Sequence, residues 1–134
     1  MLILATTLPV AAAGGTYLAI GRSAPAQRQQ QHRPKAGALL SLESFVVNLD
    51  DASGTRYLKV TIDLEMKEAP DEQSKGLVAR LRDGILLYLS SLKVADALRA
   101  ETKTAIKKRT MELANGVFGK GAAMGVYYKE FVMQ

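Results

Sequence analysis

The sequence contains no cysteine and a single histidine, His32. The absence of cysteine excludes disulfide bonds, thiolate catalysis and cysteine-ligated metal sites. Because His32 lies in a polar, glutamine-rich segment, it offers no imidazole to a folded pocket, and the common serine–histidine and histidine–metal arrangements are removed. The glycine-rich phosphate-binding motifs, the zinc-protease helix motif and the nucleophile-elbow motif are missing as well. We therefore predict that the protein is not an enzyme and needs no cofactor or metal.

Charged residues are absent from the first 21 residues, Met1 to Gly21. An α-helix rises about 1.5 Å per residue, so roughly 20 apolar residues cross the hydrocarbon core of a bilayer, which is about 30 Å thick. We therefore predict one transmembrane helix over residues 1–21. A signal peptide cleaved after Ala13 is the main alternative, although no lysine or arginine precedes the apolar run. A buried helix of a soluble core is the third possibility, which Pro9 and Gly14-Gly15 disfavour.

Small residues recur every four positions in this apolar segment, at Ala11, Gly15 and Ala19. Such a row lets a second transmembrane helix approach closely, so these residues are the predicted helix-packing face. A chance pattern in a segment rich in alanine and glycine explains the row equally well.

A basic, glutamine-rich segment comes next, and we assign it as a juxtamembrane linker over residues 22–40. Residues 1–35 carry four cations and no anion, whereas residues 36–134 carry fourteen cations and thirteen anions. The excess positive charge therefore lies mostly in the linker, where lipid headgroups explain it better than nucleic acid does. Taken alone, the positive-inside rule places the chain after the span in the cytoplasm. The abrupt start of the apolar run leads us to expect further natural residues before it.

Residues 41–134 are numerous enough to form one modest hydrophobic core. The pattern predicts a strand over Leu42–Leu49, a polar turn at Asp50–Gly54 and a second strand over Arg56–Met66. The acidic pair Asp50-Asp51 fits the turn and does not have the spacing of a calcium loop. The second strand alternates cleanly, and its predicted buried side consists of Leu58, Val60, Ile62, Leu64 and Met66.

Two helices are predicted after Pro70. The first begins with Asp71 as its predicted N-cap, and its inner face comprises Val78, Leu81, Ile85, Tyr88 and Leu92. Its segment from Ile85 to Leu89 is apolar all round, so either the domain itself or a neighbouring subunit is expected to cover it. The second helix comes after a connector over Lys93–Ala100, begins near Thr102 and ends at Gly119-Lys120-Gly121; its inner face comprises Ile106, Thr110, Leu113 and Val117. Lys103, Lys107 and Lys108 lie off this face, where a solvated surface is the simplest explanation.

The last segment, Met124–Met133, has the composition of a strand with apolar residues on both faces. Simple alternation places Tyr127, Phe131 and Met133 on one face and Val126, Tyr128 and Val132 on the other. Such a strand is expected to be central in its sheet or covered by a partner. The predicted fold class is therefore α+β, with a small antiparallel or mixed sheet and helices on one side.

Several runs of this sequence form an ordered set: Phe45–Leu49, Arg56–Val60 with Leu64 and Glu65, Arg82-Asp83 with Leu86, Leu87, Leu89 and Ser90, Asn115, and the terminal Val126–Gln134. Taken together, these runs resemble the flagellar basal-body-associated FliL family. The likeness covers residues 42–134, and Thr102 departs from it because many members have glycine there. The charged cytoplasmic tail that usually precedes the span in the family is also missing from this sequence.

The resemblance implies a single-pass inner-membrane protein whose domain over residues 41–134 lies in the periplasm and resembles the stomatin-like (SPFH) fold. It implies homo-oligomers, including rings, around stator units of the MotA/MotB type, and a supporting role in torque generation, swimming and swarming without catalysis. It places the domain opposite to the positive-inside count, and we side with the resemblance because the missing tail would remove the charges that set orientation.

Our leading hypothesis is thus a non-enzymatic membrane scaffold at the flagellar basal body that surrounds and supports the stator. Its partners are the stator proteins, the membrane and other copies of itself, and no nucleic acid is expected. The candidate oligomer or stator interface comprises Ile85, Leu86, Leu87, Leu89, Tyr127 and Phe131. The alternative is a cleaved periplasmic binding or sensor module for a small ligand.

Overall fold

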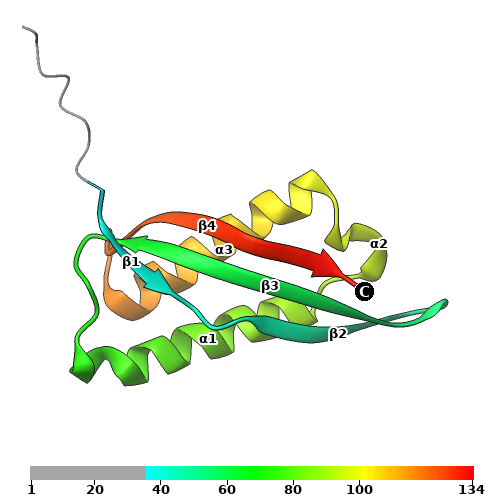
Figure 1. Ribbon diagram of the computed structural model, residues 1–134, viewed down its shortest axis with the longest axis horizontal. Helices are drawn as coiled ribbons and strands as arrows, with labels where there is room; N and C mark the ends of the chain where they lie inside the picture. Colours follow the sequence, from blue (N-terminus) through cyan, green and yellow to red (C-terminus); the bar gives the residue numbers. More distant parts are fainter. Residues whose placement is uncertain (1–35) are drawn as a thin grey trace, which may run out of the picture. The chain divides into compact units, whose positions relative to one another are not determined.

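A computed structural model describes residues 36–134 of the chain. Its elements are β1 Ala38–Ser41, β2 Phe45–Asp51, β3 Gly54–Met66, the short 3₁₀ helix η1 Glu72–Ser74, α1 Lys75–Ser90, α2 Val94–Ala97, α3 Ala100–Phe118 and β4 Ala123–Met133 (Figure 1). The α+β class and the small sheet are confirmed, and every strand pairing is antiparallel. The predicted transmembrane helix over 1–21, with Ala11, Gly15 and Ala19, lies outside the described residues. Within residues 36–134, no helix is both long and apolar enough to cross a membrane.

The long strand β3 is the centre of the sheet. Along one edge it pairs first with β2, through Phe45↔Val60, and then with β1, through Leu40↔Leu64. Along its other edge it pairs with β4 over nearly its whole length. Strands β1 and β2 therefore lie end to end beside β3 and share one edge of the sheet.

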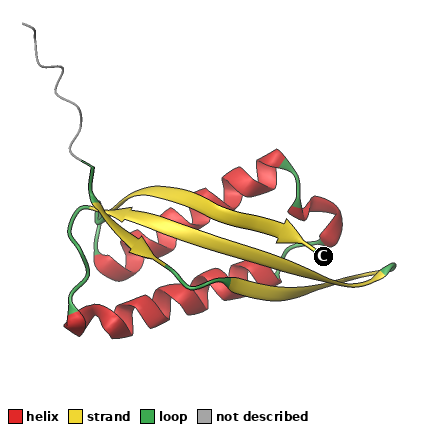
Figure 2. Cartoon of the chain, viewed as in Figure 1, coloured by secondary structure: helices red, strands yellow, loops and turns green. Residues whose placement is uncertain are grey.

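The alternation of β3 separates a buried side of the sheet from an open side. The five predicted inward residues from Leu58 to Met66 are all buried, as are Phe45, Val47 and Leu49 of β2. Helices α1 and α3 cover this side and supply Leu81, Ile85, Leu89, Ile106 and Ala114 to the same core. Figure 2 shows the helices behind the strands, with the opposite face of the sheet left uncovered.

The helix boundaries differ from the sequence prediction at two places. Asp71 does act as an N-cap, but it caps η1, where its carboxylate accepts the backbone N–H of Ser74. Helix α3 begins at Ala100 after an extended Arg99, so the predicted cap at Thr102 is wrong and Thr102 lies inside the first turn. The predicted end of α3 is confirmed, because Gly119 takes a positive φ of 108° that side chains disfavour.

Strand β4 lies at an edge of the sheet, so the first predicted alternative, a central strand, is wrong, and the second, a strand covered by a partner, stays a prediction. Among the described residues it pairs with β3 alone. Two register shifts interrupt the pairing of β4 with β3 and leave Met124 and Lys129 without a partner on β3. The strict alternation of facing is therefore broken, which is why the sequence alone places apolar residues on both faces of this strand. The bulge at Lys129 reverses the facing of the residues after it, so Tyr128 and Phe131 both pack on the core while Tyr127 faces outward.

The short strand β1 was not predicted, since its four residues fall within the segment assigned to the linker and across its boundary. Its side chains alternate in the pleat of the sheet: Leu40 packs on the core, whereas Leu39 is exposed beside Glu65. Four residues are too few for a period of two to stand out from the surrounding sequence.

Alanine substitutions at two residues of α1 that are similar in size should have unequal effects on stability, because only one of the two residues lies in the core. Ile85 is fully buried and Leu87 is 65% exposed. We expect Ile85→Ala to lower the free energy of unfolding by about 2–5 kcal/mol, because it leaves a cavity between the sheet and α3. Leu87→Ala should change it by roughly 0.5 kcal/mol or less. Denaturant unfolding of the full chain in mild detergent measures both, and equal losses would contradict this packing.

Candidate interaction surface

The six residues predicted as an interface are spread over different parts of the domain. Ile85 and Leu89 are fully buried in the core of the same chain. Leu86 and Leu87 are exposed on the outer side of α1, and Tyr127 is exposed on the open face of the sheet. Phe131 packs partly buried against the core. The structure therefore brings these six residues to no single surface, and an interface on this domain would have to use the exposed ones.

The open face of the sheet gathers the largest set of exposed apolar side chains among the described residues. We call it the outer sheet face, and its exposed apolar members are Leu39, Val46, Tyr57, Tyr127 and Val132. They come from all four strands. Strand register aligns Val46 of β2, Lys59 of β3 and Val132 of β4 in one row across the sheet. Tyrosine is enriched at protein interfaces, and this face exposes both Tyr57 and Tyr127.

Polar contacts hold the side chains of the outer sheet face in fixed positions. Lys59 Nζ lies 3.1 Å from Glu130 Oε2 on the neighbouring strand. In the next row, the hydroxyl groups of Ser44 and Thr61 lie 2.8 Å apart. Each of these contacts is exposed and adds little free energy by itself. Together they orient the charges between the apolar residues.

Glu65 of β3 makes hydrogen bonds that attach the residue before β1 and a residue of β4 to the centre of the sheet. Its two carboxylate oxygens accept hydrogen bonds from the Gly37 N–H, at 2.9 Å, and from the Tyr127 hydroxyl, at 2.7 Å. Gly125 lies directly opposite Glu65, and a Cβ atom there would come within 2.8 Å of the Tyr127 oxygen. The absence of a side chain at Gly125 therefore lets Tyr127 reach across the strand to Glu65.

These hydrogen bonds shift the ionisation of both partners. The Gly37 N–H, and after it the Tyr127 hydroxyl, lowers the pKa of Glu65 below its usual range. The charged carboxylate in turn raises the pKa of Tyr127. A lowered carboxyl pKa favours the folded state at pH values above the unfolded pKa, and this contribution is lost as the pH falls through the folded pKa. Attachment of β1 is therefore expected to weaken in acid.

Asp63 is the one side chain of residues 36–134 that has a buried polar atom without a hydrogen bond from this part of the chain. Its Oδ1 is shielded from solvent, and the nearest cation is Lys129 Nζ at 4.0 Å. Buried acceptors are normally satisfied. Because this oxygen is shielded from solvent, the ammonium group of Lys129 is the charge that compensates it.

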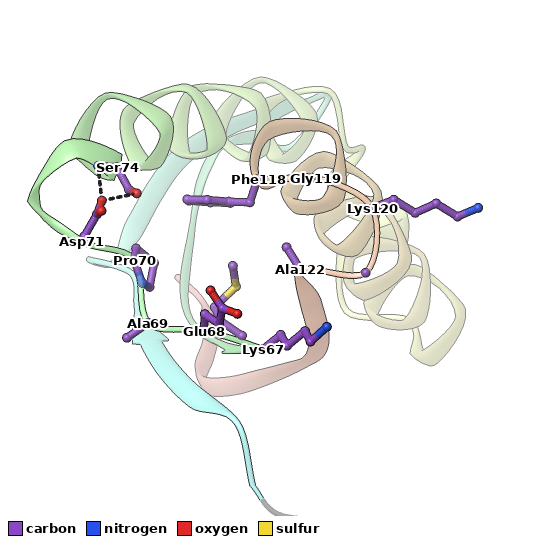
Figure 3. Close-up of a pocket in the computed structure, with 12 residues that line it drawn as sticks. Lys67, Glu68, Ala69, Pro70, Asp71, Ser74, Phe118, Gly119, Lys120 and Ala122 are labelled. Atoms are coloured by element: carbon purple, nitrogen blue, oxygen red, sulfur yellow. Dashed lines mark hydrogen bonds between the residues drawn. The ribbon is translucent and has the colours of Figure 1, made fainter.

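A separate cavity of about 360 Å³ lies where β3 leads towards η1 and where α3 turns into β4. Figure 3 shows the Phe118 ring along one side, Lys67 and Glu68 along the opposite side, and Pro70 near Asp71 at one end, while Lys120 extends away from the cavity. Asp71 and Ser74 are joined there by hydrogen bonds. The volume falls within the range of small-ligand pockets, about 300–1,000 Å³. No group of three potential metal-ligating side chains occurs in residues 36–134.

The comparison with known proteins agrees with this architecture. Residues 39–134 match the family described as flagellar basal body-associated protein FliL, so the match includes every strand and helix of the domain apart from Ala38, the first residue of β1. The chain belongs to the FliL family. It is also 30% identical, over 105 residues, to a protein named flagellar protein FliL from Aquifex aeolicus (strain VF5). That alignment covers 75% of this chain and 64% of the relative, so the chain spans less than two thirds of the relative's length.

Several residues of this FliL domain have roles that sequence reasoning did not assign. The Gly37–Glu65–Tyr127 cluster was missed because its members lie far apart in the chain and meet only through strand register. The exposed residues Leu39, Val46 and Val132 were missed because each is a single apolar residue within a short strand. Their common position on one sheet face appears only after pairing is known.

Removal of the Tyr127 hydroxyl should change the ionisation of Glu65. We expect Tyr127→Phe to raise the pKa of Glu65 towards the usual glutamate value of about 4.3, because one of two stabilising donors is lost. Carboxyl titration by NMR measures this shift. Tyr57→Phe is the matched control, since Tyr57 lies on the same face and makes no hydrogen bond to Glu65. An unshifted Glu65 in the Tyr127 variant would show that the hydrogen bond does not form in solution.

Proposed function

We propose that this chain is a non-enzymatic accessory protein of the flagellar motor that scaffolds the stator from the inner membrane. Membership of the FliL family is the observation that carries this proposal. A domain that presents a broad interaction surface agrees with a role in assembly. The stator partner is of the MotA/MotB type, as the family resemblance implies.

Membrane attachment is the first part of the proposal. The uncharged residues 1–21 would form a single transmembrane helix, with Ala11, Gly15 and Ala19 as its packing face. The basic residues 22–40 would lie beside the bilayer, and the FliL domain over residues 41–134 would lie in the periplasm. Such an arrangement holds the outer sheet face and the exposed side of α1 at a set height above the membrane.

Contact with neighbours is the second part. The outer sheet face offers Val46, Tyr127 and Val132, and α1 offers Leu86 and Leu87. Two such surfaces on different sides of one domain can bind two different neighbours, which a ring of copies around a stator requires. A ring would support torque by binding the open, anchored state of the stator more tightly than the closed state. A stomatin-like arrangement of the domain belongs to this same proposal.

A cleaved periplasmic binding module is the second candidate function. The cavity beside Phe118 and Pro70 favours it, because its volume suits a small molecule. Intact mass of the protein extracted from membranes distinguishes the two candidates. Retention of residues 1–21 supports the scaffold, whereas a mature chain that starts after Ala13 supports the cleaved module.

Crosslinking in living cells tests the scaffold proposal. A photoreactive amino acid at Val46 or Val132, or at Leu87, should form crosslinks to the stator subunits and to further copies of the chain. The same group at Lys120, an exposed position in the turn between α3 and β4 outside both apolar surfaces, is the control and should form few crosslinks. Absence of stator products from all three test positions would contradict the proposal.

A further inference from the structure

The free edge of the sheet along β4 presents unpaired backbone groups. Gln134 and Tyr57 exchange two hydrogen bonds, each 2.8 Å long, at the end of the β3–β4 ladder. In an antiparallel ladder, successive residues turn their backbone N–H and C=O groups to opposite sides. Phe131 and Met133 therefore direct theirs away from β3, and no other strand of residues 36–134 pairs with this edge. An open edge of this kind can accept an additional strand.

A row of side chains from α3 runs alongside this edge. Lys103 Nζ lies 4.9 Å from the centre of the Phe131 ring, and four residues on, Lys107 Nζ lies 5.1 Å from the Tyr128 ring. Four residues further, Met111 joins Val126 in lining a groove of about 470 Å³. Thr104, Lys108 and Glu112 also line this groove. Helix α3 thus runs along β4 in the opposite direction and forms a wall beside its free edge.

The groove carries positive charge that residues 36–134 do not neutralise. Lys103, Lys107 and Lys108 form no ion pair with this part of the chain. Glu112 is already paired with Arg109 at 3.3 Å. The aromatic contacts of Lys103 and Lys107 hold their ammonium groups beside β4 while leaving them able to bind an anion. Carboxylates of a partner are the complementary groups.

The spacing of the row fits an extended chain. Positions four apart on a helix are separated by about 6 Å along its axis. Alternate residues of a strand, which share one face, are separated by about 6.6–6.8 Å. A strand added beside β4 would therefore place consecutive helix-facing side chains opposite Lys103, Lys107 and Met111 in turn.

We propose that the β4 edge and the adjoining α3 groove bind an acidic, extended segment of a partner protein as an additional antiparallel strand. Its recognised pattern is acidic residue, any residue, acidic residue, any residue, apolar residue. The carboxylates meet Lys103 and Lys107, with Lys108 close by, and the apolar residue meets Met111 and Val126. This surface is separate from the outer sheet face and from Leu86 and Leu87, so this proposal and the stator scaffold can fail independently.

Binding of a designed probe tests the proposal. The probe is a fluorescently labelled peptide, Thr-Glu-Thr-Glu-Thr-Val-Thr, added to the full chain in mild detergent, with anisotropy as the readout. Saturable binding is expected, and it should weaken as salt is raised from about 20 to 300 mM because exposed charges are screened. A peptide with lysine in place of both glutamates should not bind. Equal binding of the lysine peptide would overturn the proposal.

Charge-reversal variants locate the site. The double variant Lys107→Glu with Lys108→Glu should lower the affinity for the probe peptide by about tenfold, which corresponds to about 1.4 kcal/mol of binding free energy. Lys75→Glu with Lys93→Glu makes the same change of charge at exposed positions away from the groove and should leave the affinity within about twofold. Equal losses in the two double variants would mean general electrostatic attraction and would overturn the site.

Backbone pairing is tested separately. Met133→Pro removes a backbone N–H that points away from β3, whereas Met133→Leu keeps it. Only the proline variant should therefore lose affinity for the probe peptide. Amide exchange at Val132, whose N–H faces β3, shows whether the proline variant keeps its sheet. Slowed amide exchange at Phe131 and Met133 on probe addition is the expected direct sign of an added strand. A folded proline variant with full affinity, or competition by a thymidine oligonucleotide as effective as unlabelled peptide, would overturn the proposal.

Discussion

Pairing of β3 along both of its edges is the constraint on which the rest of the domain depends. With β1 and β2 on one side and β4 on the other, a shift of β3 by one residue would turn Leu58, Val60, Ile62 and their companions towards solvent. The helices could not then bury their apolar faces. The register of this one strand therefore sets the core and, at the same time, the composition of the outer sheet face.

The same constraint explains why the domain has surfaces of different character. The sheet is only three strands wide at any point, and α1 and α3 both pack on one side of it, so the other face stays uncovered. The uncovered face mixes apolar side chains with oriented charges such as Lys59 and Glu130. The β4 edge, next to α3, is instead basic and offers backbone groups. Two surfaces of such different character suit different kinds of neighbour.

Much of the fold was predictable where the signal is local. The alternation in β3, the cap at Asp71 and the end of α3 at Gly119 are encoded by residues that are adjacent in sequence. Strand β4 was placed correctly along the chain, but its facing was wrong beyond Lys129, because a bulge depends on how β4 meets β3 and has no marker in this sequence. Strand β1 is too short to reveal a period.

The interaction surfaces were less predictable because they consist of residues that pairing brings together. Leu39, Val46 and Val132 are ordinary as single residues and become a surface only through the register of four strands. The all-round apolar stretch of α1 was informative in part: Ile85 and Leu89 belong to the core, and Leu86 and Leu87 remain exposed. The resemblance to the FliL family, which was found from ordered sequence runs, is confirmed over residues 39–134.

The central claim is that the outer sheet face supports the motor. Its most direct test is motor speed under high load in cells whose only copy of the protein carries Val46→Asp and Val132→Asp, with cellular protein level and thermal unfolding matched to the natural sequence. Ala95→Asp, an exposed change on α2 outside both apolar surfaces, is the control. The account predicts that the double variant slows the motor as far as deletion of the protein does, while the control turns normally. Full speed in the double variant, or in the deletion strain, would contradict it.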